Sequence, residues 1–246
     1  MSFAAFEIIG AQRPGRWLIT CDHATNHVPE EVNGGTLGLP EDQMARHIAY
    51  DIGAAGVTRR LAERLDAPAI LSCFSRLVID PNRGEDDPTL VMRLYDGTIV
   101  PGNRHADAAE IERRKDLCYR PYHDALADLA ARRDDTILVA IHSFTPRLYG
   151  RHPRPWQVGI LHAWDSRLAV PLIERLRQEP DLFVGDNEPY AGHLPGDSID
   201  RHALHHGRPN ALIELRHDLI ADEAGQIHWA DRLAPILEEV LARTQL

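Results

Sequence analysis

Short apolar runs alternate along this chain with longer segments of helical periodicity, and this alternation constrains the fold more than any other feature of the sequence. The pattern is typical of α/β proteins, in which helices cover both faces of a largely parallel sheet. It predicts a three-layer α/β fold with a mostly parallel, mixed central sheet. The candidate strands are Trp17–Cys21, Ala69–Cys73, Leu77–Asp80, Thr136–Ile141, Val158–Leu161, Leu182–Val184 and Ala211–Leu215. The candidate helices are Glu41–Leu65, Ala108–Arg132, Arg167–Arg177 and about Trp229–Ala242.

The domain organisation follows from the length and from the connecting segments. The chain has 246 residues and no linker rich in proline, glycine and serine. We therefore expect a single domain over residues 1–246. Several connecting segments are long and polar, and loops of that kind commonly carry function. They are Asn33–Leu39, Pro81–Asn103, Phe144–Pro155 and Asp186–Pro209.

Charge and cysteine content narrow the class of protein. The formal net charge is −10, which argues against nucleic acid or an anionic membrane as a partner, because both require a basic surface. The N-terminal residues lack the pattern of a signal peptide, and no apolar run reaches about 18 residues, so we expect neither export nor membrane insertion. Cys21, Cys73 and Cys118 lack CxxC spacing and do not resemble a disulfide framework. We expect a cytoplasmic protein.

Three titratable residues follow or end predicted strands. His23 and His142 come directly after apolar runs, and Glu214 lies near the end of another. The carboxyl ends of parallel strands converge on one crevice, so these side chains could meet there. Imidazole and carboxylate suit Zn²⁺, whose catalytic sites keep three protein ligands and one open position. The chain has 14 histidines, however, so the alternative is a pair of hydrogen-bonded loop histidines.

Five motifs around these positions occur in the order found in the N-formylglutamate amidohydrolase family. They are Asp22-His23-Ala-Thr-Asn26-His-Val-Pro29, Phe74-Ser-Arg76-Leu-Val-Ile-Asp80-Pro-Asn82-Arg83, His142-Ser143-Phe-Thr-Pro146, Asn187-Glu-Pro-Tyr190 and Ile213-Glu214-Leu-Arg216. The sequence resembles that family from about Leu18 to Trp229. The family in turn resembles the zinc carboxypeptidases and aspartoacylases. The resemblance implies a fold like theirs, also described as phosphorylase/hydrolase-like.

The resemblance also implies roles for the three titratable residues. His23 and His142 correspond to ligands of one zinc ion, and Glu214 corresponds to the general base. The chemistry is consistent, because Zn²⁺ lowers the pKa of bound water toward about 7 and a carboxylate nearby can pass that proton to the leaving amine. The alternative for Glu214 is an ion pair with Arg216.

At the position of the third metal ligand, the sequence differs from the pattern of the zinc carboxypeptidases. The zinc carboxypeptidases have a Glu three positions after the first His, where this chain has Asn26, and a neutral amide is a poor zinc ligand. Asp51 is our candidate, since a carboxylate in an otherwise apolar stretch with helical periodicity needs a partner. Its alternative is to accept hydrogen bonds from backbone N–H groups or from an arginine. Asp22 is a second candidate ligand, and Asn26 then orients the loop.

Substrate contacts are also implied by the resemblance. Asn82 and Arg83 resemble the pair that holds a substrate carboxylate, which guanidinium binds bidentately. Arg76 and Arg216 could hold a second carboxylate or support the first, as a dianionic substrate would require. Tyr190 could donate a hydrogen bond to the oxyanion or cover the site. The alternatives without a functional role are that Arg83 is a solvent-exposed loop residue and that Tyr190 is an aromatic residue packed within its loop.

The sequence therefore predicts a zinc-dependent amidohydrolase that cleaves a small anionic N-acyl amino acid. The resemblance makes N-formyl-L-glutamate the expected substrate, giving formate and L-glutamate, a step of histidine degradation. One alternative keeps the metal site and changes the substrate, as in a carboxypeptidase or another N-acyl amino acid hydrolase. Another is a non-catalytic binding protein on the same fold. A serine hydrolase is rejected, because Ser143 lies outside a G-x-S-x-G motif.

Overall fold

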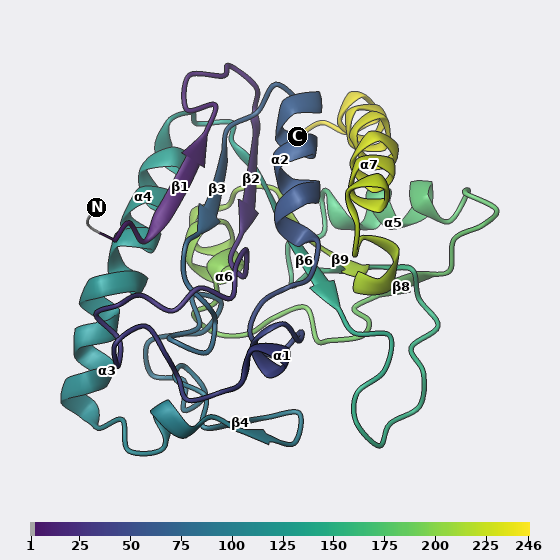
Figure 1. Cartoon of the computed structure of the whole chain (residues 1–246). Coiled ribbons are helices and arrows are strands. Elements are labelled where there is room, and N and C mark those ends of the chain that lie inside the picture. The colour runs from purple at the N-terminus through teal and green to yellow at the C-terminus, as the bar shows by residue number, and fades with distance from the viewer. Residues whose placement is uncertain (1–2) are drawn as a thin grey trace.

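The structure, a computed structural model, describes residues 3–246. Within these residues a seven-stranded sheet forms the centre of the molecule, with helices on both faces (Figure 1). The strands lie in the order β1-β3-β2-β6-β9-β7-β8. Their bounds are β1 Phe6–Ile9, β2 Trp17–Cys21, β3 Ala69–Ser72, β6 Ile137–Phe144, β7 Val158–Leu161, β8 Val184–Asp186 and β9 Asn210–Arg216. A separate hairpin pairs β4 Leu94–Tyr95 with β5 Thr98–Ile99.

The strand directions confirm a mixed, mostly parallel sheet. β3, β2, β6 and β9 are neighbours and run parallel to one another. β1 is antiparallel to β3 at one edge, and β7 is antiparallel to β9 near the other, with β8 parallel to β7. The carboxyl ends of β2, β6 and β9 therefore meet at one edge of the sheet.

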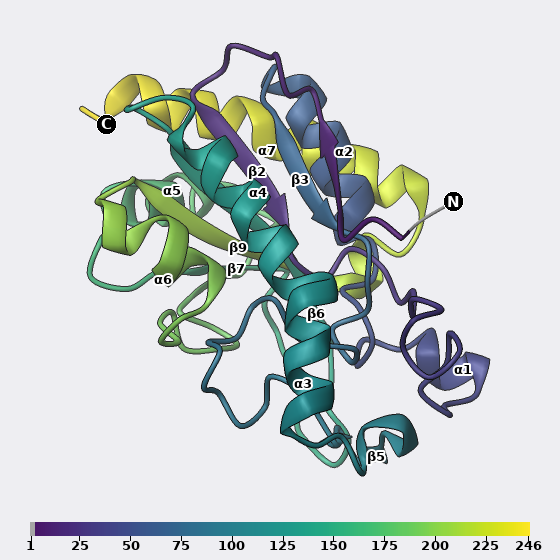
Figure 2. The ribbon, with the colours of Figure 1, turned by 90° about the vertical axis from the view of Figure 1, so that its left-hand side faces the viewer.

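Helices cover the two faces of the sheet and so confirm the three-layer α/β prediction. Alternate residues of β2 point to opposite faces, with Trp17 and Ile19 in the core under α2, α5 and α7, and Leu18 in the core under α4 and α6 (Figure 2). The helix bounds are α1 Glu41–Met44, α2 Ala54–Arg64, α3 Ala108–Arg114, α4 Arg120–Ala131, α5 Ala169–Leu176, α6 Ser198–His202 and α7 Glu223–Arg243. Short 3-10 turns occupy Pro101–Asn103, Leu204–His206 and His217–Leu219.

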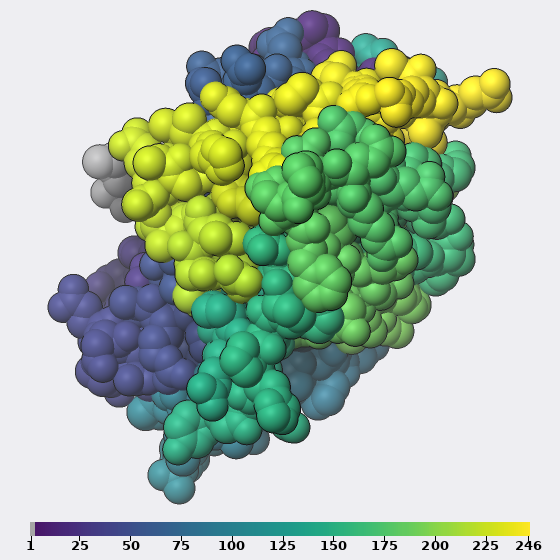
Figure 3. All heavy atoms as spheres, turned by 90° about the vertical axis from the view of Figure 1, so that its right-hand side faces the viewer, coloured from purple at the N-terminus to yellow at the C-terminus, as the bar shows by residue number. Residues whose placement is uncertain are grey.

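The C-terminal helix α7 is longer than predicted. It begins at Glu223 instead of near Trp229, because the Asp222 side chain accepts a hydrogen bond from the Gly225 N–H at 2.8 Å and caps an additional turn and a half. α7 packs against α2 and α5. Figure 3 views the molecule from the α7 and α5 side, and the loop after β6 projects from the lower part of that view.

The predicted strand Leu77–Asp80 is wrong. These residues form a buried, turn-rich loop, and their carbonyl groups are satisfied by side chains instead of a neighbouring strand. The Asn103 side chain donates to the Leu77 carbonyl at 2.7 Å, and buried Arg114 donates to the Val78 carbonyl at 2.9 Å. The sheet gains β1 instead, which was not predicted because Phe6–Ile9 is a short, half-exposed edge strand.

The predicted helix Glu41–Leu65 is two helices, α1 and α2, separated by a loop. Gly53 ends that loop with φ at +80°, a conformation that a helix cannot contain. A Cβ there would lie 2.0 Å from the carbonyl oxygen of Ile220, so only glycine fits. Asp51 consequently lies in a loop at the start of α2 and not within a helix.

The remaining predicted elements are confirmed with shifted ends. The predicted helix 108–132 is continuous as α3, a π-helical segment Lys115–Tyr119, and α4. The Asp107 side chain caps it by accepting a hydrogen bond from the Glu110 N–H at 2.9 Å. The π-helical segment precedes Pro121, whose ring would clash with a regular α-helical turn. β8 begins at Val184, where the predicted strand ended. No helix within residues 3–246 has the length and apolarity needed to cross a membrane.

Candidate active site

Three predicted site residues lie together where the parallel strands end. His23 is two residues past the end of β2, while His142 and Glu214 lie within β6 and β9. His142 was expected just after its strand, but β6 continues to Phe144. His142 and Glu214 are register partners in the β6–β9 ladder. Residues paired in this way point to the same face, so strand pairing brings the imidazole and the carboxyl side by side.

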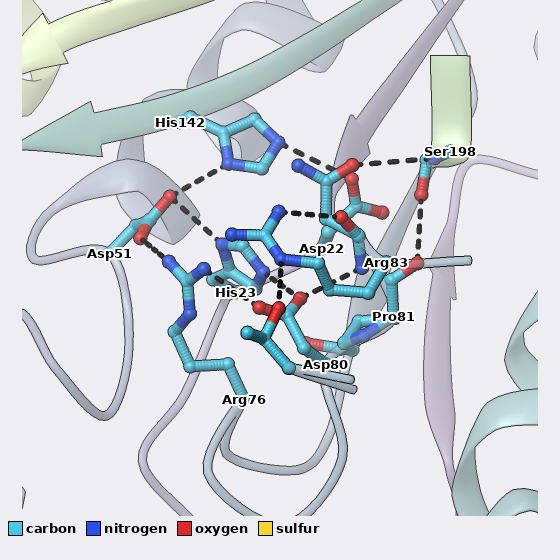
Figure 4. A network of polar contacts seen from close by, with 12 residues as sticks. Asp22, His23, Asp51, Arg76, Asp80, Pro81, Arg83, His142 and Ser198 are labelled. Atoms are coloured by element: carbon cyan, nitrogen blue, oxygen red, sulfur yellow. Dashed lines mark hydrogen bonds and ion pairs between the residues drawn. The ribbon is translucent and has the colours of Figure 1, made fainter. Parts of the chain in front are cut away.

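Asp51 joins the two histidines from the loop before α2 (Figure 4). Its Oδ2 atom lies 3.3 Å from His23 Nδ1 and 2.8 Å from His142 Nδ1. Ligand-type atoms of the three residues all lie within 4.8 Å of one another, and all three residues are buried. The structure thus gathers the three residues that we expected as metal ligands into one cluster, called here the His-Asp-His cluster.

The second nitrogen of each imidazole contacts another buried carboxylate. His23 Nε2 lies 2.7 Å from Asp80 Oδ1, and His142 Nε2 lies 3.3 Å from Asp22 Oδ2. A carboxylate only accepts hydrogen bonds, so each Nε2 carries the hydrogen and donates it. The Nδ1 atoms are then the ones that face Asp51. Carboxylates of this kind fix the tautomer and orientation of histidines that bind metals.

The contacts of the His-Asp-His cluster favour a positive charge on His142. Asp51 Oδ2 only accepts hydrogen bonds, so an Nδ1 atom that pairs with it must carry a hydrogen, in addition to the hydrogen on Nε2. Burial disfavours a charge on His142, but its hydrogen bonds to Asp22 and Asp51 outweigh burial and hold the pKa of His142 well above its usual value. A proton therefore balances the cluster here, and a cation could replace it. Imidazole nitrogen and carboxylate oxygen are donors that suit Zn²⁺, so these residues fit that ion.

Glu214 is a buried carboxyl group beside the cluster. Its Oε2 atom has no hydrogen-bond partner within residues 3–246. Burial raises its pKa to about 7, with His142 lowering it and Asp51 raising it further. A group that titrates near neutral pH can both accept and donate a proton. The alternative ion pair with Arg216 is not formed, because the Arg216 guanidinium pairs with Asp218 at 2.8 Å.

A cavity of about 240 Å³ opens beside the cluster and is lined by Asn82 and Arg83, among others. The Asn82 Oδ1 atom accepts a hydrogen bond from the Ser198 N–H at 3.3 Å. Arg83 donates from Nε to Thr89 Oγ1 at 3.2 Å and from Nη1 to the Asn82 carbonyl at 3.0 Å. These contacts orient the guanidinium and leave Nη2 without a partner in the described part of the chain. The predicted carboxylate clamp therefore lies in the wall of the cavity.

Arg76 lines the same cavity but is already paired. Its Nη2 atom lies 2.7 Å from Asp80 Oδ2 and its Nη1 atom 3.5 Å from Asp51 Oδ1, and the residue is buried. Its charge therefore balances two carboxylates of the site and is not free for a substrate. Arg216 does not line the cavity at all. The structure thus separates these two arginines from Arg83, although the sequence predicted substrate contacts for all three.

Tyr190 lines the cavity from the loop after β8. Its hydroxyl oxygen accepts a hydrogen bond from Arg154 Nη1 at 3.0 Å, which leaves the hydroxyl hydrogen free to donate. Burial raises the pKa of Tyr190, so the hydroxyl stays protonated at neutral pH. The loop reaches the site over Gly159, where a Cβ would lie 1.9 Å from the Glu188 carbonyl oxygen. A protonated hydroxyl at the cavity wall can donate a hydrogen bond to a ligand oxygen.

The sequence did not predict that the carboxylates of Asp80 and Asp22 contact the Nε2 atoms of the two histidines. Both residues lie in motifs of the family, but nothing in the motifs indicates these contacts. Asp22 was considered only as a metal ligand. Its other oxygen accepts a hydrogen bond from the Tyr122 hydroxyl at 2.6 Å, and Tyr122 lies on α4, a hundred residues along the chain. Only the folded chain reveals such a contact.

Two weaker candidates have structural roles. Asn26, in the position of the expected ligand, donates from Nδ2 to the Met44 carbonyl at 2.9 Å and so orients its loop. Ser143 donates from Oγ to the Ile52 carbonyl at 2.8 Å. Its hydroxyl is therefore directed away from the neighbouring imidazole, in agreement with the rejection of a serine hydrolase.

The fold and the site together define the class: an α/β protein whose buried His-Asp-His cluster lies beside a carboxyl group that titrates near neutral pH, an arrangement suited to hydrolysis. The model of one family, N-formylglutamate amidohydrolase, matches residues 15–221. The match covers most of the chain, and the protein belongs to the N-formylglutamate amidohydrolase family. Membership confirms the predicted resemblance and supports amidohydrolase activity.

Solved structures agree with this assignment. A gene product of Agrobacterium tumefaciens, Atu2144, is 36% identical with a TM-score of 0.91, and the match covers 97% of this chain and 95% of that one. N-formylglutamate amidohydrolase from Ralstonia eutropha JMP134 is 17% identical with a TM-score of 0.70, over 99% of both chains. A bacteriophage poly-gamma-glutamate hydrolase is 9% identical with a TM-score of 0.53, over 99% of this chain and 91% of that one. The last two show a shared fold. No curated protein matches the chain.

Proposed function

We propose that this protein is a zinc-dependent hydrolase of N-acyl amino acids, and that N-formyl-L-glutamate, the compound in the family's name, is cleaved to formate and L-glutamate. The observation that carries the proposal is the convergence of His23, His142 and Asp51 on one buried point, with Glu214 beside it. His23 and His142 would bind the ion through Nδ1, and Asp51 through its carboxylate. When bound, zinc supplies a Lewis acid that polarises the acyl carbonyl and acidifies water.

Glu214 performs the proton transfers in this proposal. With a pKa of about 7, its carboxylate accepts a proton from the water that attacks the acyl carbon. The same proton passes to the nitrogen as the carbon–nitrogen bond breaks, so that a neutral amine leaves. The unpartnered Oε2 atom supports this role, because it is buried and free to bond to water or substrate. A general base of this kind contributes about 10²–10⁴ to the rate.

Asn82, Arg83 and Tyr190 position the substrate. The Arg83 guanidinium is held by Thr89 and by the Asn82 carbonyl, so its free edge can bind the α-carboxylate without a large loss of side-chain entropy. The Tyr190 hydroxyl can donate to the oxygen that becomes negatively charged when water attacks. Arg76 lowers the pKa of Asp80 and contacts both Asp80 and Asp51, so it helps to hold these carboxylates in place.

Formate release from N-formyl-L-glutamate by zinc-loaded protein tests the proposal. We expect release that is abolished by a chelator and restored by zinc. His142→Ala should lose both metal and activity, whereas Glu214→Gln should retain one equivalent of zinc and lose about 10²–10⁴ in kcat. Release that persists in the chelated protein would rule out zinc dependence. Loss of zinc from Glu214→Gln would make Glu214 a ligand and not the base.

A further inference from the structure

The cavity contains a second carboxyl group that the proposed reaction does not use. Asp197 lines the cavity and is only 7% exposed. Its Oδ1 atom caps α6 by accepting a hydrogen bond from the Asp200 N–H at 2.8 Å. Its Oδ2 atom has no hydrogen-bond partner in residues 3–246. This oxygen is accessible from the cavity, so it is free to accept a hydrogen bond from water or from a bound ligand.

Asp197 lies next to the proposed clamp for the α-carboxylate. The Asn82 side chain accepts a hydrogen bond from the Ser198 N–H, and Ser198 directly follows Asp197. A substrate held there brings the groups near its α-carbon toward Asp197. Aliphatic side chains complete this part of the cavity wall; they are Leu161, Ile199 and Leu212. The region therefore combines an apolar wall with one acid.

The cavity has no spare cation for a second substrate carboxylate. In the described residues, Arg76 and Arg83 are the arginines that line it, and no lysine does. Arg76 is neutralised by its two carboxylate partners, and Arg83 binds the α-carboxylate in the proposed function. His193 also lines the cavity, but its Nε2 contacts Asp200 Oδ1 at 3.2 Å. A side-chain carboxylate placed beside Asp197 would therefore have no cationic partner among the arginines and lysines of the described residues.

We propose that Asp197 selects the side chain of the substrate, accepting a hydrogen bond from a neutral amide such as that of glutamine and disfavouring the carboxylate of glutamate. This rests on the proposed function, because it concerns the N-acyl amino acid held at the same site. An ionised Asp197 attracts an amide N–H, whereas two carboxylates in contact repel each other unless one is protonated. N-formyl-L-glutamate would still be cleaved, in keeping with the proposed function, but the corresponding glutamine compound would bind more tightly at pH 8.

The protonation of Asp197 makes the preference depend on pH. The pKa of Asp197 is raised to about 6, mainly by burial. The negative charges of Asp22 and Asp200 raise this pKa further, whereas the hydrogen bond from the Asp200 N–H and the nearby His193 lower it. Asp197 is then mostly ionised at pH 8 and mostly protonated at pH 5. A protonated Asp197 can donate a hydrogen bond to a carboxylate. The preference for the amide should therefore be large at pH 8 and small at pH 5.

The test measures binding to the zinc-loaded Glu214→Gln protein, so that turnover does not interfere. Titration calorimetry gives Kd values for N-formyl-L-glutamine and N-formyl-L-glutamate at pH 8 and pH 5. We expect at least about tenfold tighter binding of the glutamine compound at pH 8. Adding Asp197→Asn should reduce this preference to about threefold or less at both pH values. Asparagine caps helices as well as aspartate does, so α6 should be retained.

Asp200→Asn is the matched control, because it removes a neighbouring negative charge from a residue that does not line the cavity. It should keep most of the preference. Equal or tighter binding of the glutamate compound at pH 8, or an unchanged preference after Asp197→Asn, would overturn the proposal. Turnover by the zinc-loaded wild type tests the proposed function separately. Binding of neither compound would overturn both.

Discussion

Glu214 on β9 is the register partner of His142 on β6, so the parallel ladder itself holds a buried acid beside an imidazole of the His-Asp-His cluster. Backbone hydrogen bonds of the sheet fix this spacing, which a loop would fix less rigidly. The burial that results raises the pKa of Glu214 to about 7. The same pairing therefore positions the proposed base and adjusts its acidity.

Burial of Glu214 should lower the stability of the metal-free protein at alkaline pH. The pKa of about 7 in the folded protein exceeds the usual value of 4.5, so the folded state binds more protons between these pH values. The stability that Glu214 contributes is present below about pH 4.5 and is lost as the pH rises toward 7. At 1.36 kcal/mol per pKa unit, the loss is on the order of 3 kcal/mol.

We therefore expect Glu214→Gln to be more stable than wild type at pH 8 by up to that amount, and by much less at pH 5. Urea denaturation of EDTA-treated protein measures both differences. Comparing the two proteins at each pH cancels the titration of other groups. The same difference in stability between the two proteins at both pH values would show that burial does not raise the pKa of Glu214.

Asp51 and Asp22 can be distinguished as third ligands by zinc content. Asp51 Oδ2 lies within 3.3 Å of both imidazole Nδ1 atoms, whereas Asp22 contacts the Nε2 atom of His142. After dialysis, Asp51→Asn should hold well below one equivalent of zinc, and Asp22→Asn close to one. Elemental analysis measures both. The reverse result would assign the ligand to Asp22.

Asp80 should tune the affinity for zinc without binding it. Its contact with His23 Nε2 at 2.7 Å orients the imidazole and makes Nδ1 a better electron-pair donor to a metal ion. Asp80→Asn should weaken zinc binding by about 10–100-fold, measured by competition with a chelating dye. Tyr122→Phe, which removes a hydrogen bond from Asp22 and not from a histidine, is the matched control and should have a smaller effect. Unchanged affinity in Asp80→Asn would remove this role.

The sequence predicted the centre of the sheet because its strands are continuous apolar runs that end in polar residues. β2, β6 and β9 were found in this way, together with the site residues at their ends. The apolar run at Leu77–Asp80 misled the prediction, since side chains of Asn103 and Arg114 replace the strand partner that such a run usually needs. Pattern alone does not distinguish a buried loop from a buried strand.

Most site residues were predicted from the five motifs, whereas contacts that only the tertiary structure defines were missed even for residues within a motif. Asp51 was expected from the need of a buried carboxylate for a partner, and the structure brings it to both histidines. The pairing of Asp80 with His23 spans 57 residues and has no local signal. Arg76 and Arg83 belong to one motif, but the Arg76 guanidinium is occupied by ion pairs with Asp51 and Asp80, whereas Arg83 Nη2 has no partner in the described residues.

Arg83 should contribute to substrate affinity through its contact with the α-carboxylate. Arg83→Ala should lower kcat/KM by about 10–100-fold, since a charge-assisted contact is worth roughly 1.5–3 kcal/mol. If the contact acts equally before and during reaction, KM alone rises; if it also positions the carbonyl, kcat falls too. Steady-state kinetics with N-formyl amino acids separates the two.

A substrate whose α-carboxylate is amidated supplies the control. The wild type should discriminate strongly against it, because the guanidinium then lacks its anionic partner, and Arg83→Ala should discriminate much less. Arg83→Lys keeps the charge but not the bidentate geometry, so it should recover only part of the loss. Arg76 is a poor substitute for this role, because Asp51 and Asp80 already occupy its guanidinium. Unchanged discrimination in Arg83→Ala would therefore indicate that the carboxylate is bound by uncharged donors such as Asn82 and not by an arginine.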